Sequence, residues 1–290
     1  MPSRRVMRNR RIATGIVAAL VLALCLAVSL FAFSRPGHPV PGAAKRASGL
    51  ESVYASGMPK AAPKSDQMHK VDAPEALLAQ PSFDRERFEG KPVSSVDTKK
   101  HEVAITFDDG PSPATPKYLS VLAKYKAHAT FFVIGYRAWH YPDFVYQMVG
   151  QGNEVGSHTW SHVRLEKKIG AANLRMQVNR PVSLLTTETG QAPIFVRPRS
   201  GKYDAAGLAA VKRAHLVMVL WSTHANDIED ILPPNQLVTN ALEGVHPGSI
   251  ILMHETNPNT LIALPSVLKE LKRRGLKPVT LSRLLADAEK

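Results

Sequence analysis

The 290-residue sequence has a single cysteine, Cys25, which excludes an internal disulfide. Because Cys25 lies within an apolar run, cysteine usage does not indicate a redox compartment. Internal repeats are absent as well. Apolar residues make up 44% of the chain, an ordinary share for a globular protein. The chain can therefore form a sizeable core, as one large domain or two small ones.

Acidic residues are few relative to basic ones: 24 Asp and Glu stand against 37 Lys and Arg, a net charge of +13. Such an excess is compatible with nucleic acid or with another anionic surface. The chain lacks, however, the basic stripe interleaved with aromatics that a nucleic-acid site needs. We therefore expect no nucleic-acid partner and a solvated or membrane-facing role for the basic residues.

Residues 12–33 form an unbroken uncharged run rich in Ala, Leu and Val. At about 1.5 Å per residue, a helix of this length spans a hydrocarbon core of about 30 Å. The basic segment 1–11 precedes the run, so the positive-inside rule keeps the N-terminus cytoplasmic and exports the rest. The alternative is a cleaved signal peptide, but the run exceeds a usual h-region and no clean A-x-A site follows. A lipoprotein signal requires a small residue before Cys25, where Leu24 stands.

We accordingly expect an uncleaved, single-pass signal-anchor in the cell membrane (the inner membrane), with the rest of the chain on the periplasmic or extracellular side. Residues 34–98 are rich in Pro, Gly, Ala, Ser and Lys and show no lasting helical or strand period. Such a stretch buries too little apolar surface to offset its ordering entropy. The sequence thus predicts a disordered, flexible linker over 34–98 and a folded catalytic domain over 99–290.

From about residue 99, short β-rich runs alternate with segments of helical spacing. Strands are expected at 103–107, 129–134, 154–156, 194–196, 216–221 and 249–253, and helices at 116–125, 143–149, 172–187, 208–214, 236–242 and 264–274. Pro181 falls inside one of these helices and should kink or divide it. Repeated β-then-α units indicate parallel strands wrapped by helices, as in an α/β barrel or a doubly wound sheet.

Chemically competent residues follow the predicted strands. They are Asp108 and Asp109, then His158, Arg197, Asp227 and His254. In barrels and open α/β sheets, sites collect at the carboxyl ends of strands. Five such positions in succession are hard to explain by packing, so we expect one site at this end of the sheet.

His158 and His162 are four residues apart, a spacing that places both imidazoles on one face of a helix. With a carboxylate from Asp109 they make a two-His, one-carboxylate set, which leaves positions open for water and substrate. The alternative is that the histidines are unrelated and that the Asp108-Asp109-Gly110 sequence only caps a turn.

The remaining strand-end residues suit supporting roles. His254 fits a general acid for a leaving amine. Arg197 can pair with a carboxylate and keep it ionised. Asp227 is expected either to hold His254 in the useful tautomer or to cap the following helix.

Three motifs resemble those of the polysaccharide deacetylase family, also called the NodB homology domain or carbohydrate esterase family 4. They are Thr106–Pro111 (TFDDGP), His158–His162 (HTWSH), and Leu252 two residues before His254. The resemblance covers residues 101–286. It implies that Asp108 is the catalytic base, that Asp109, His158 and His162 are metal ligands, that His254 is the general acid, and that Leu252 lines the acetyl-methyl pocket.

Two other motifs depart from the family pattern. Residues 197–201 read RPRSG where the family has RPPYG, and residues 224–228 read HANDI where it has DxxDW. Ser200 still supplies the backbone N–H that the family offers to the oxyanion, since a main-chain donor tolerates a changed side chain. We expect Ser200, Gly201, Leu252 and Trp221 in the substrate-binding site. The departures affect the sugar-binding wall more than the reaction.

The sequence therefore predicts a distorted (β/α) barrel of about seven parallel strands, preceded by one transmembrane helix and a disordered tether. The expected function is metal-dependent removal of N-acetyl groups from a polysaccharide containing N-acetylglucosamine: peptidoglycan, poly-N-acetylglucosamine or chitin oligomers. Zn²⁺ suits the ligand set, with Co²⁺, Ni²⁺ or Mn²⁺ as alternatives. Two rival functions are a membrane-tethered, non-catalytic glycan-binding protein and a metal-dependent amidohydrolase or phosphoesterase of small molecules.

Overall fold

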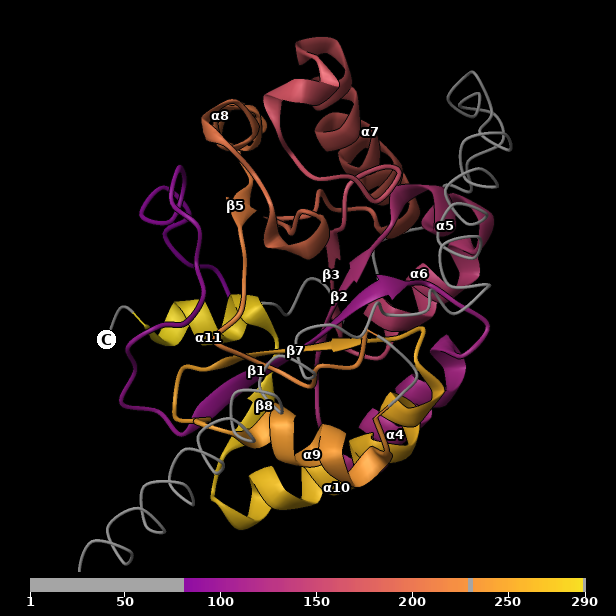
Figure 1. Cartoon of the computed structure of the whole chain (residues 1–290), viewed down its shortest axis with the longest axis vertical. Coiled ribbons are helices and arrows are strands. Elements are labelled where there is room, and N and C mark those ends of the chain that lie inside the picture. The colour runs from indigo at the N-terminus through magenta and orange to yellow at the C-terminus, as the bar shows by residue number, and fades with distance from the viewer. Residues whose placement is uncertain (1–80, 229–231, 289–290) are drawn as a thin grey trace, which may run out of the picture. The chain divides into compact units, whose positions relative to one another are not determined.

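The computed structural model describes residues 81–228 and 232–288, which form one α/β unit (Figure 1). The predicted basic N-terminus, the membrane segment and most of the linker lie outside the described residues. Within the described ranges, no helix combines the length and apolar character needed to cross a membrane.

All the paired strands of the central sheet are parallel. The strands are β1 (Glu102–Gly110), β2 (Thr130–Val133), β3 (Glu154–Ser157), β4 (Phe195–Val196), β5 (Val217–Met218), β6 (Thr223–His224), β7 (Ile250–His254) and β8 (Lys277–Val279). Seven follow the order β5-β4-β3-β2-β1-β7-β6, and β8 pairs with the first residues of β1. The expected set of about seven parallel strands is confirmed, as a curled half-barrel with β5 and β6 at the ends of the path.

The helices follow the strands along the chain. They are α4 (Thr115–Tyr125), α5 (Gly135–His140), α6 (Pro142–Gly150), α7 (Ala171–Thr189), α8 (Ala205–Arg213), α9 (Pro234–Leu242), α10 (Pro258–Arg273) and α11 (Leu281–Asp287), with 3₁₀ turns at Lys167–Ile169 and Arg199–Gly201. All six helices expected from the sequence are present. The sequence analysis missed α5, α11, β6 and β8, each of which is short.

The helix α7 runs without interruption through Pro181, so the expectation that this proline divides it is wrong. Proline lacks an N–H, and its ring leaves the carbonyl four residues earlier without a helical partner. Here that carbonyl belongs to Gln177, and it accepts instead from the backbone N–H of Trp160 at 3.0 Å. A bond from outside the helix therefore satisfies the group that Pro181 leaves open.

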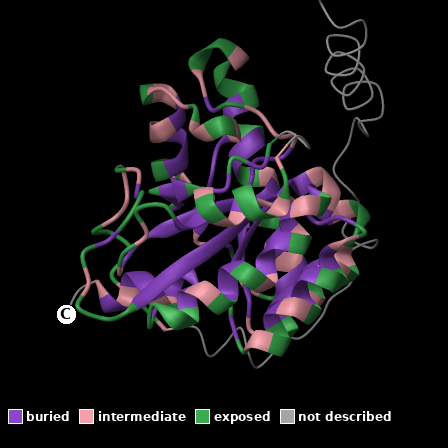
Figure 2. Cartoon of the chain, turned by 60° about the horizontal axis from the view of Figure 1, so that its bottom comes forward, coloured by how far each residue is buried: buried purple, intermediate pink, exposed green. Residues whose placement is uncertain are grey.

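Alternating residues of β1 face two different parts of the core. Val103, Ile105 and Phe107 belong to the cluster that packs beneath the outer helices. Ala104 faces the other way, into an inner cluster that includes Phe132. Figure 2 shows the resulting arrangement, with buried strands at the centre and helices exposed only on their outer sides. A strand with both faces buried is mostly apolar, as β1 is from Val103 to Phe107, where Thr106 is the one polar residue.

The segment 81–98, assigned to the linker from its composition, packs against the barrel. Val93 forms a parallel bridge just beyond β5, and Ser95 forms an antiparallel bridge just ahead of β7. Phe83 stacks on the first residue of β4, with ring centroids 5.8 Å apart. The packed unit therefore begins ahead of the expected boundary at residue 99. Its few apolar residues follow no period, because each packs against a different part of the barrel.

Candidate metal centre and active site

The polar residues expected to cluster do come together at the carboxyl end of the sheet. Asp108 and His254 are register partners near the ends of β1 and β7. Arg197 directly follows β4, and its N–H bonds to the last residue of β3, next to His158. Parallel strands bring their carboxyl ends to one edge, so residues far apart in sequence become neighbours.

An irregularity at the end of β1 turns two adjacent aspartates towards the same site. Asp108 lies on the inward face, two residues beyond Thr106, and the pairing of β1 with β2 shifts register between Asp108 and Gly110. Asp109 itself has a left-handed backbone (φ 70°). In a regular strand its side chain would point away from that of Asp108. The shift and the positive φ remove this alternation.

Three side-chain atoms, one from the end of β1 and two from the loop after β3, form a candidate cation site. Asp109 Oδ1 lies 3.1 Å from His162 Nε2 and 3.5 Å from His158 Nε2, and one ligand atom from each residue lies within 4.8 Å of the others. Ligands bound tetrahedrally at about 2.1 Å stand about 3.4 Å apart. Asp109 Oδ1 is buried, and no hydrogen-bond partner for it exists among the described residues. The donor set and its spacing fit a divalent cation.

His158 is held in the tautomer that a metal ligand requires. Its Nδ1 lies 2.8 Å from the carbonyl oxygen of Arg197, which can only accept, so Nδ1 carries the proton. The Nε2 lone pair is then directed at Asp109. Such an outer hydrogen bond fixes both the tautomer and the ring orientation of a ligating histidine.

The two histidines do not share a helix, so the geometry assumed from their spacing is wrong. Residues 158–163 form a loop after β3, in which Thr159 (φ 66°) and His162 (φ 55°) are left-handed. A loop that reverses direction at two such residues brings His162 back beside His158, with ring centroids 4.8 Å apart. The convergence was expected; the backbone that produces it was not.

The electrostatics favour the protonation states that bind a cation. Burial raises the pKa of Asp109, but the charges of His162 and His158 outweigh it, and the pKa is lowered. Burial, with the charge of His158, lowers the pKa of His162 to about 3. An ionised carboxylate and a neutral imidazole are the forms that metals require.

Arg197 forms the expected pair with a carboxylate, and the carboxylate is that of Asp108. Its Nη1 donates to Asp108 Oδ1 at 2.7 Å and to Thr106 Oγ1 at 2.8 Å. Its Nη2 and Nε donate to backbone carbonyls beyond β5, and its guanidinium lies 4.1 Å from the Phe132 ring centre. Arg197 is fully buried, so this network fixes the orientation of Asp108.

Asp227 holds His254 rather than capping the next helix. Its Oδ1 lies 2.8 Å from His254 Nδ1, and its Oδ2 accepts from the His254 N–H and from the Thr260 hydroxyl. Burial disfavours charge on His254, but the hydrogen bond and charge of Asp227, with the charges of Asp108 and Asp109, raise the pKa of His254 to about 9. His254 Nε2 remains the ring nitrogen able to exchange a proton with another group.

The expected substrate-binding residues lie in different local environments. Ser200 is exposed and left-handed (φ 54°), and Gly201 follows it with φ 63°. A Cβ on Gly201 would lie 3.0 Å from the Trp221 ring, so this close approach needs glycine. Leu252 is buried in β7 on the same face as His254.

The sequence analysis did not single out Glu255 or Arg137. Glu255 is buried and accepts from the Ser112 N–H and hydroxyl, at 3.0 and 2.8 Å, and from the Thr115 hydroxyl. A Cβ on Gly110 would collide with the Glu255 carboxylate. Arg137 Nη1 donates to the Asp109 carbonyl. Both residues hold the aspartate loop, and the only available signal was the position of Glu255 directly after His254.

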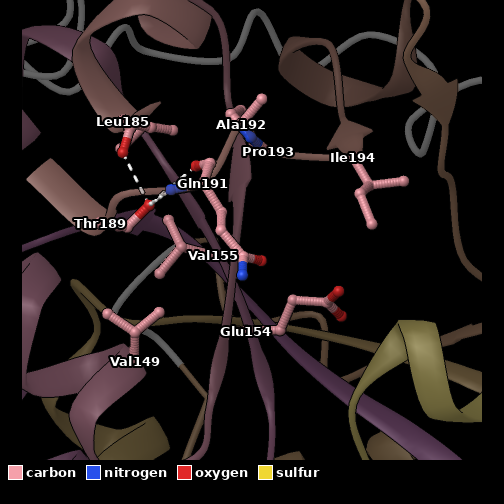
Figure 3. Close-up of a pocket in the computed structure, with 9 residues that line it drawn as sticks. All are labelled: Val149, Glu154, Val155, Leu185, Thr189, Gln191, Ala192, Pro193 and Ile194. Carbon is pink, nitrogen blue, oxygen red and sulfur yellow. Dashed lines mark hydrogen bonds between the residues drawn. The ribbon is translucent and has the colours of Figure 1, made fainter. Parts of the chain in front are cut away.

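A small cavity of about 40 Å³ lies away from this centre (Figure 3). Its lining includes Glu154, the first residue of β3, and Ile194, just ahead of β4, with Val149 and Leu185 from the helices. These residues stand at the amino-terminal ends of the strands. No residue of the candidate centre lines the cavity, so we do not assign catalysis to it.

Comparison with known proteins identifies the family. A sequence profile described as polysaccharide deacetylase matches residues 95–219. A peptidoglycan-N-acetylglucosamine deacetylase of Bacillus cereus is 35% identical over 199 residues, covering 63% of this chain and 87% of the relative. The peptidoglycan-N-acetylmuramic acid deacetylase PdaC of Bacillus subtilis is 34% identical over 193 residues, 66% of this chain but only 40% of PdaC.

The solved structure of the Bc1960 peptidoglycan N-acetylglucosamine deacetylase, in complex with 4-naphthalen-1-yl-N-oxidanyl-benzamide, is also similar. It superposes with a TM-score of 0.64 and 31% identity, covering 70% of this chain and 96% of that one. The resemblance expected from the motifs is confirmed. The chain belongs to the polysaccharide deacetylase family, and its enzyme class is that of the polysaccharide N-deacetylases.

Proposed function

We propose that this chain is a metal-dependent hydrolase that removes N-acetyl groups from the N-acetylglucosamine units of peptidoglycan. One observation carries the proposal: the ligand atoms of Asp109, His158 and His162 converge, beside Asp108 and His254 on neighbouring strands. Peptidoglycan is preferred over poly-N-acetylglucosamine and chitin because the similar B. cereus protein is named as a peptidoglycan deacetylase.

Asp109, His158 and His162 would hold the cation, with Zn²⁺ the first choice and Co²⁺, Ni²⁺ or Mn²⁺ as alternatives. When bound, such an ion polarises a carbonyl and lowers the pKa of water towards about 7. The orphaned Asp109 oxygen and the fixed tautomer of His158 support this assignment.

Asp108 takes the proton from the attacking water in this proposal. Arg197 fixes the orientation of the Asp108 carboxylate, since its Nη1 lies 2.7 Å from Oδ1, while Oδ2 lies 3.6 Å from His158 Nε2. Attack on the acetamide carbon gives a tetrahedral oxyanion, and the backbone N–H of Ser200 is the proposed donor to it. Leu252 and Trp221 are proposed to line the pocket for the acetyl group and the sugar.

His254 supplies the proton for the leaving amine. Asp227 occupies its Nδ1, so the proton passes from Nε2 to the nitrogen as the carbon–nitrogen bond breaks. The raised pKa keeps His254 protonated near neutral pH, as a general acid requires. The products are acetate and a free glucosamine unit.

We also propose that residues 12–33 anchor the chain in the membrane and place the catalytic domain on the periplasmic or extracellular side. The length and composition of the run, and the arginines before it, support this. Alkaline carbonate extraction of cell membranes tests the anchor: the chain is expected to stay in the pellet, and full release would refute the proposal.

Mass spectrometry of acetyl loss tests the reaction. The full chain is incubated with peptidoglycan fragments, chitooligosaccharides and poly-N-acetylglucosamine, with Asp108→Asn as the matched variant. Loss of acetyl groups from peptidoglycan fragments, reduced in the variant, is expected. Glycan binding without acetate release would favour the non-catalytic glycan-binding protein. A parallel assay with p-nitrophenyl phosphate covers the other rival: hydrolysis of this ester without acetyl loss from any glycan would favour the phosphoesterase.

A further inference from the structure

The loop that carries both candidate histidine ligands needs support from outside itself. Thr159 and His162 are left-handed, a conformation that is unfavourable for any residue other than glycine. Such backbone persists only where its surroundings hold it in place. The N–H groups of Gly135 and Tyr136, at the start of α5, bond to the carbonyls of Thr159 and Trp160. They hold one side of the loop.

One residue of α7, Gln177, holds the other side. Its carbonyl accepts from the Trp160 N–H at 3.0 Å, and its side-chain Oε1 accepts from the Ser161 N–H at 2.9 Å. Its Nε2 donates to the Ser161 hydroxyl at 2.7 Å. Gln177 is 3% exposed, so these bonds are shielded from water. Both bonded residues lie between His158 and His162.

The proline in α7 accounts for the first of these bonds. In an uninterrupted helix the N–H of residue 181 would take the Gln177 carbonyl. Pro181 has no N–H, so the carbonyl is left for Trp160. A proline in a helix interior is strongly unfavourable relative to alanine. In α7 the proline leaves the Gln177 carbonyl free to accept the Trp160 N–H of the loop that holds both histidines.

We infer that Gln177, with its carbonyl freed by Pro181, is a positioning residue that sets the geometry of His158 and His162 for cation binding. It touches neither ligand and acts through Trp160 and Ser161. The inference rests on the metal centre proposed above. Groups that hydrogen-bond directly to metal ligands typically change metal affinity by about 10- to 100-fold when they are replaced, and Gln177, one contact further out, is expected to act at the lower end of that range.

The test replaces the amide with an apolar side chain of similar length, Gln177→Met, in the full chain. The matched control is Asn153→Leu. Asn153 is also a buried amide that accepts one backbone N–H and donates to one carbonyl, but it lies at the amino-terminal end of β3. Both variants lose similar hydrogen bonds, so both are expected to lower the melting temperature of the metal-free protein.

The deciding measurement is the dissociation constant for Co²⁺ or Zn²⁺, by competition with a chromophoric chelator, together with the visible spectrum of the Co²⁺ form. Gln177→Met is expected to weaken binding by about tenfold or more and to alter the spectrum. Asn153→Leu should change neither. Equal dissociation constants in Gln177→Met and the parent would overturn the inference. A parent chain that binds no metal would instead refute the proposed metal centre.

Two further variants keep the test decisive if Gln177→Met does not fold. Pro181→Ala returns an N–H to α7, and this N–H competes with Trp160 for the Gln177 carbonyl. Metal binding is then expected to weaken, although a helix-breaking residue has been removed. Ser161→Ala deletes only the hydroxyl that Gln177 Nε2 contacts and should raise the dissociation constant by a smaller factor. Unchanged metal binding in both variants would contradict the inference.

Discussion

Replacing Asp227 with asparagine should separate the charge of this residue from its shape. The carboxylate gives His254 its hydrogen bond at Nδ1 and the nearest negative charge. Asparagine is nearly isosteric but neutral, and one of its two terminal groups can only donate. We therefore expect the pKa of His254 to fall, because burial, which lowers it, is then opposed only by the more distant aspartates.

The size of the effect follows from the shift itself. The pKa of His254 is raised from 6.5 to about 9, which at 1.36 kcal/mol per unit is roughly 3 kcal/mol in favour of the charged form. A general acid works only while protonated, so activity is lost as pH rises through its pKa. If the pKa returns to about 7 or below, the protonated fraction at pH 8 falls about tenfold. A bound dication would offset the contributions of Asp108 and Asp109 in both proteins, so the comparison isolates Asp227.

The assay is acetate release from a soluble N-acetylated glycan between pH 5 and 10 at saturating metal. The basic limb of kcat should move to lower pH by about two units in Asp227→Asn. Thr260→Val is the control, because it removes a hydroxyl that donates to Asp227 Oδ2 and leaves the carboxylate in place. If the basic limb stays at the parent's pH in Asp227→Asn, His254 is not the acid that this geometry indicates.

Three further outcomes are expected. Asp108→Asn should bind Zn²⁺ with nearly the parent's affinity and lose about 10²- to 10⁴-fold in kcat, since it removes a general base and no ligand; full activity would end that assignment. Chelation should abolish activity and added Zn²⁺ or Co²⁺ should restore it, whereas His162→Ala should recover little at the same metal concentration; activity that survives complete chelation would contradict the metal site. Phe83→Ala should lower the free energy of unfolding by about 1–2 kcal/mol, less than for a fully buried phenylalanine, while the control Tyr146→Ala, exposed on α6, should change it by less than about 0.5 kcal/mol. Urea titrations measure both values, and equal free energies of unfolding in the two variants would mean that the Phe83 contact adds no stability.

Sequence reasoning predicted those parts of the molecule that depend on local pattern. The two-sided burial of β1 appears as the apolar run ahead of Asp108, and the strand-end rule then placed Asp108, His158, Arg197 and His254 together. The gathering of these residues at one edge of a parallel sheet follows from their positions after the strands, so it can be predicted without knowing how the side chains pack.

The parts that sequence did not predict depend on contacts between distant segments. Nothing near His162 signals a left-handed backbone, because the bonds that hold the loop come from α5 and α7. Pro181 was expected to kink or divide its helix, because the residue that bonds to the freed Gln177 carbonyl, Trp160, lies 21 residues before the proline. The packing of residues 81–98 could not be predicted either, because their scattered apolar side chains are buried only by contact with the folded barrel.

The first described residues of the chain pack on the side of the barrel away from the candidate active site. Phe83 stacks on the opening residue of β4, and Arg85 donates to the carbonyl of His215, just ahead of β5. Both contacts lie at the amino-terminal ends of strands whose opposite ends carry Arg197 and Trp221. Phe83 and Arg85 therefore contact the side of the barrel opposite the candidate active site. A polysaccharide bound across the carboxyl ends of these strands would leave both contacts undisturbed.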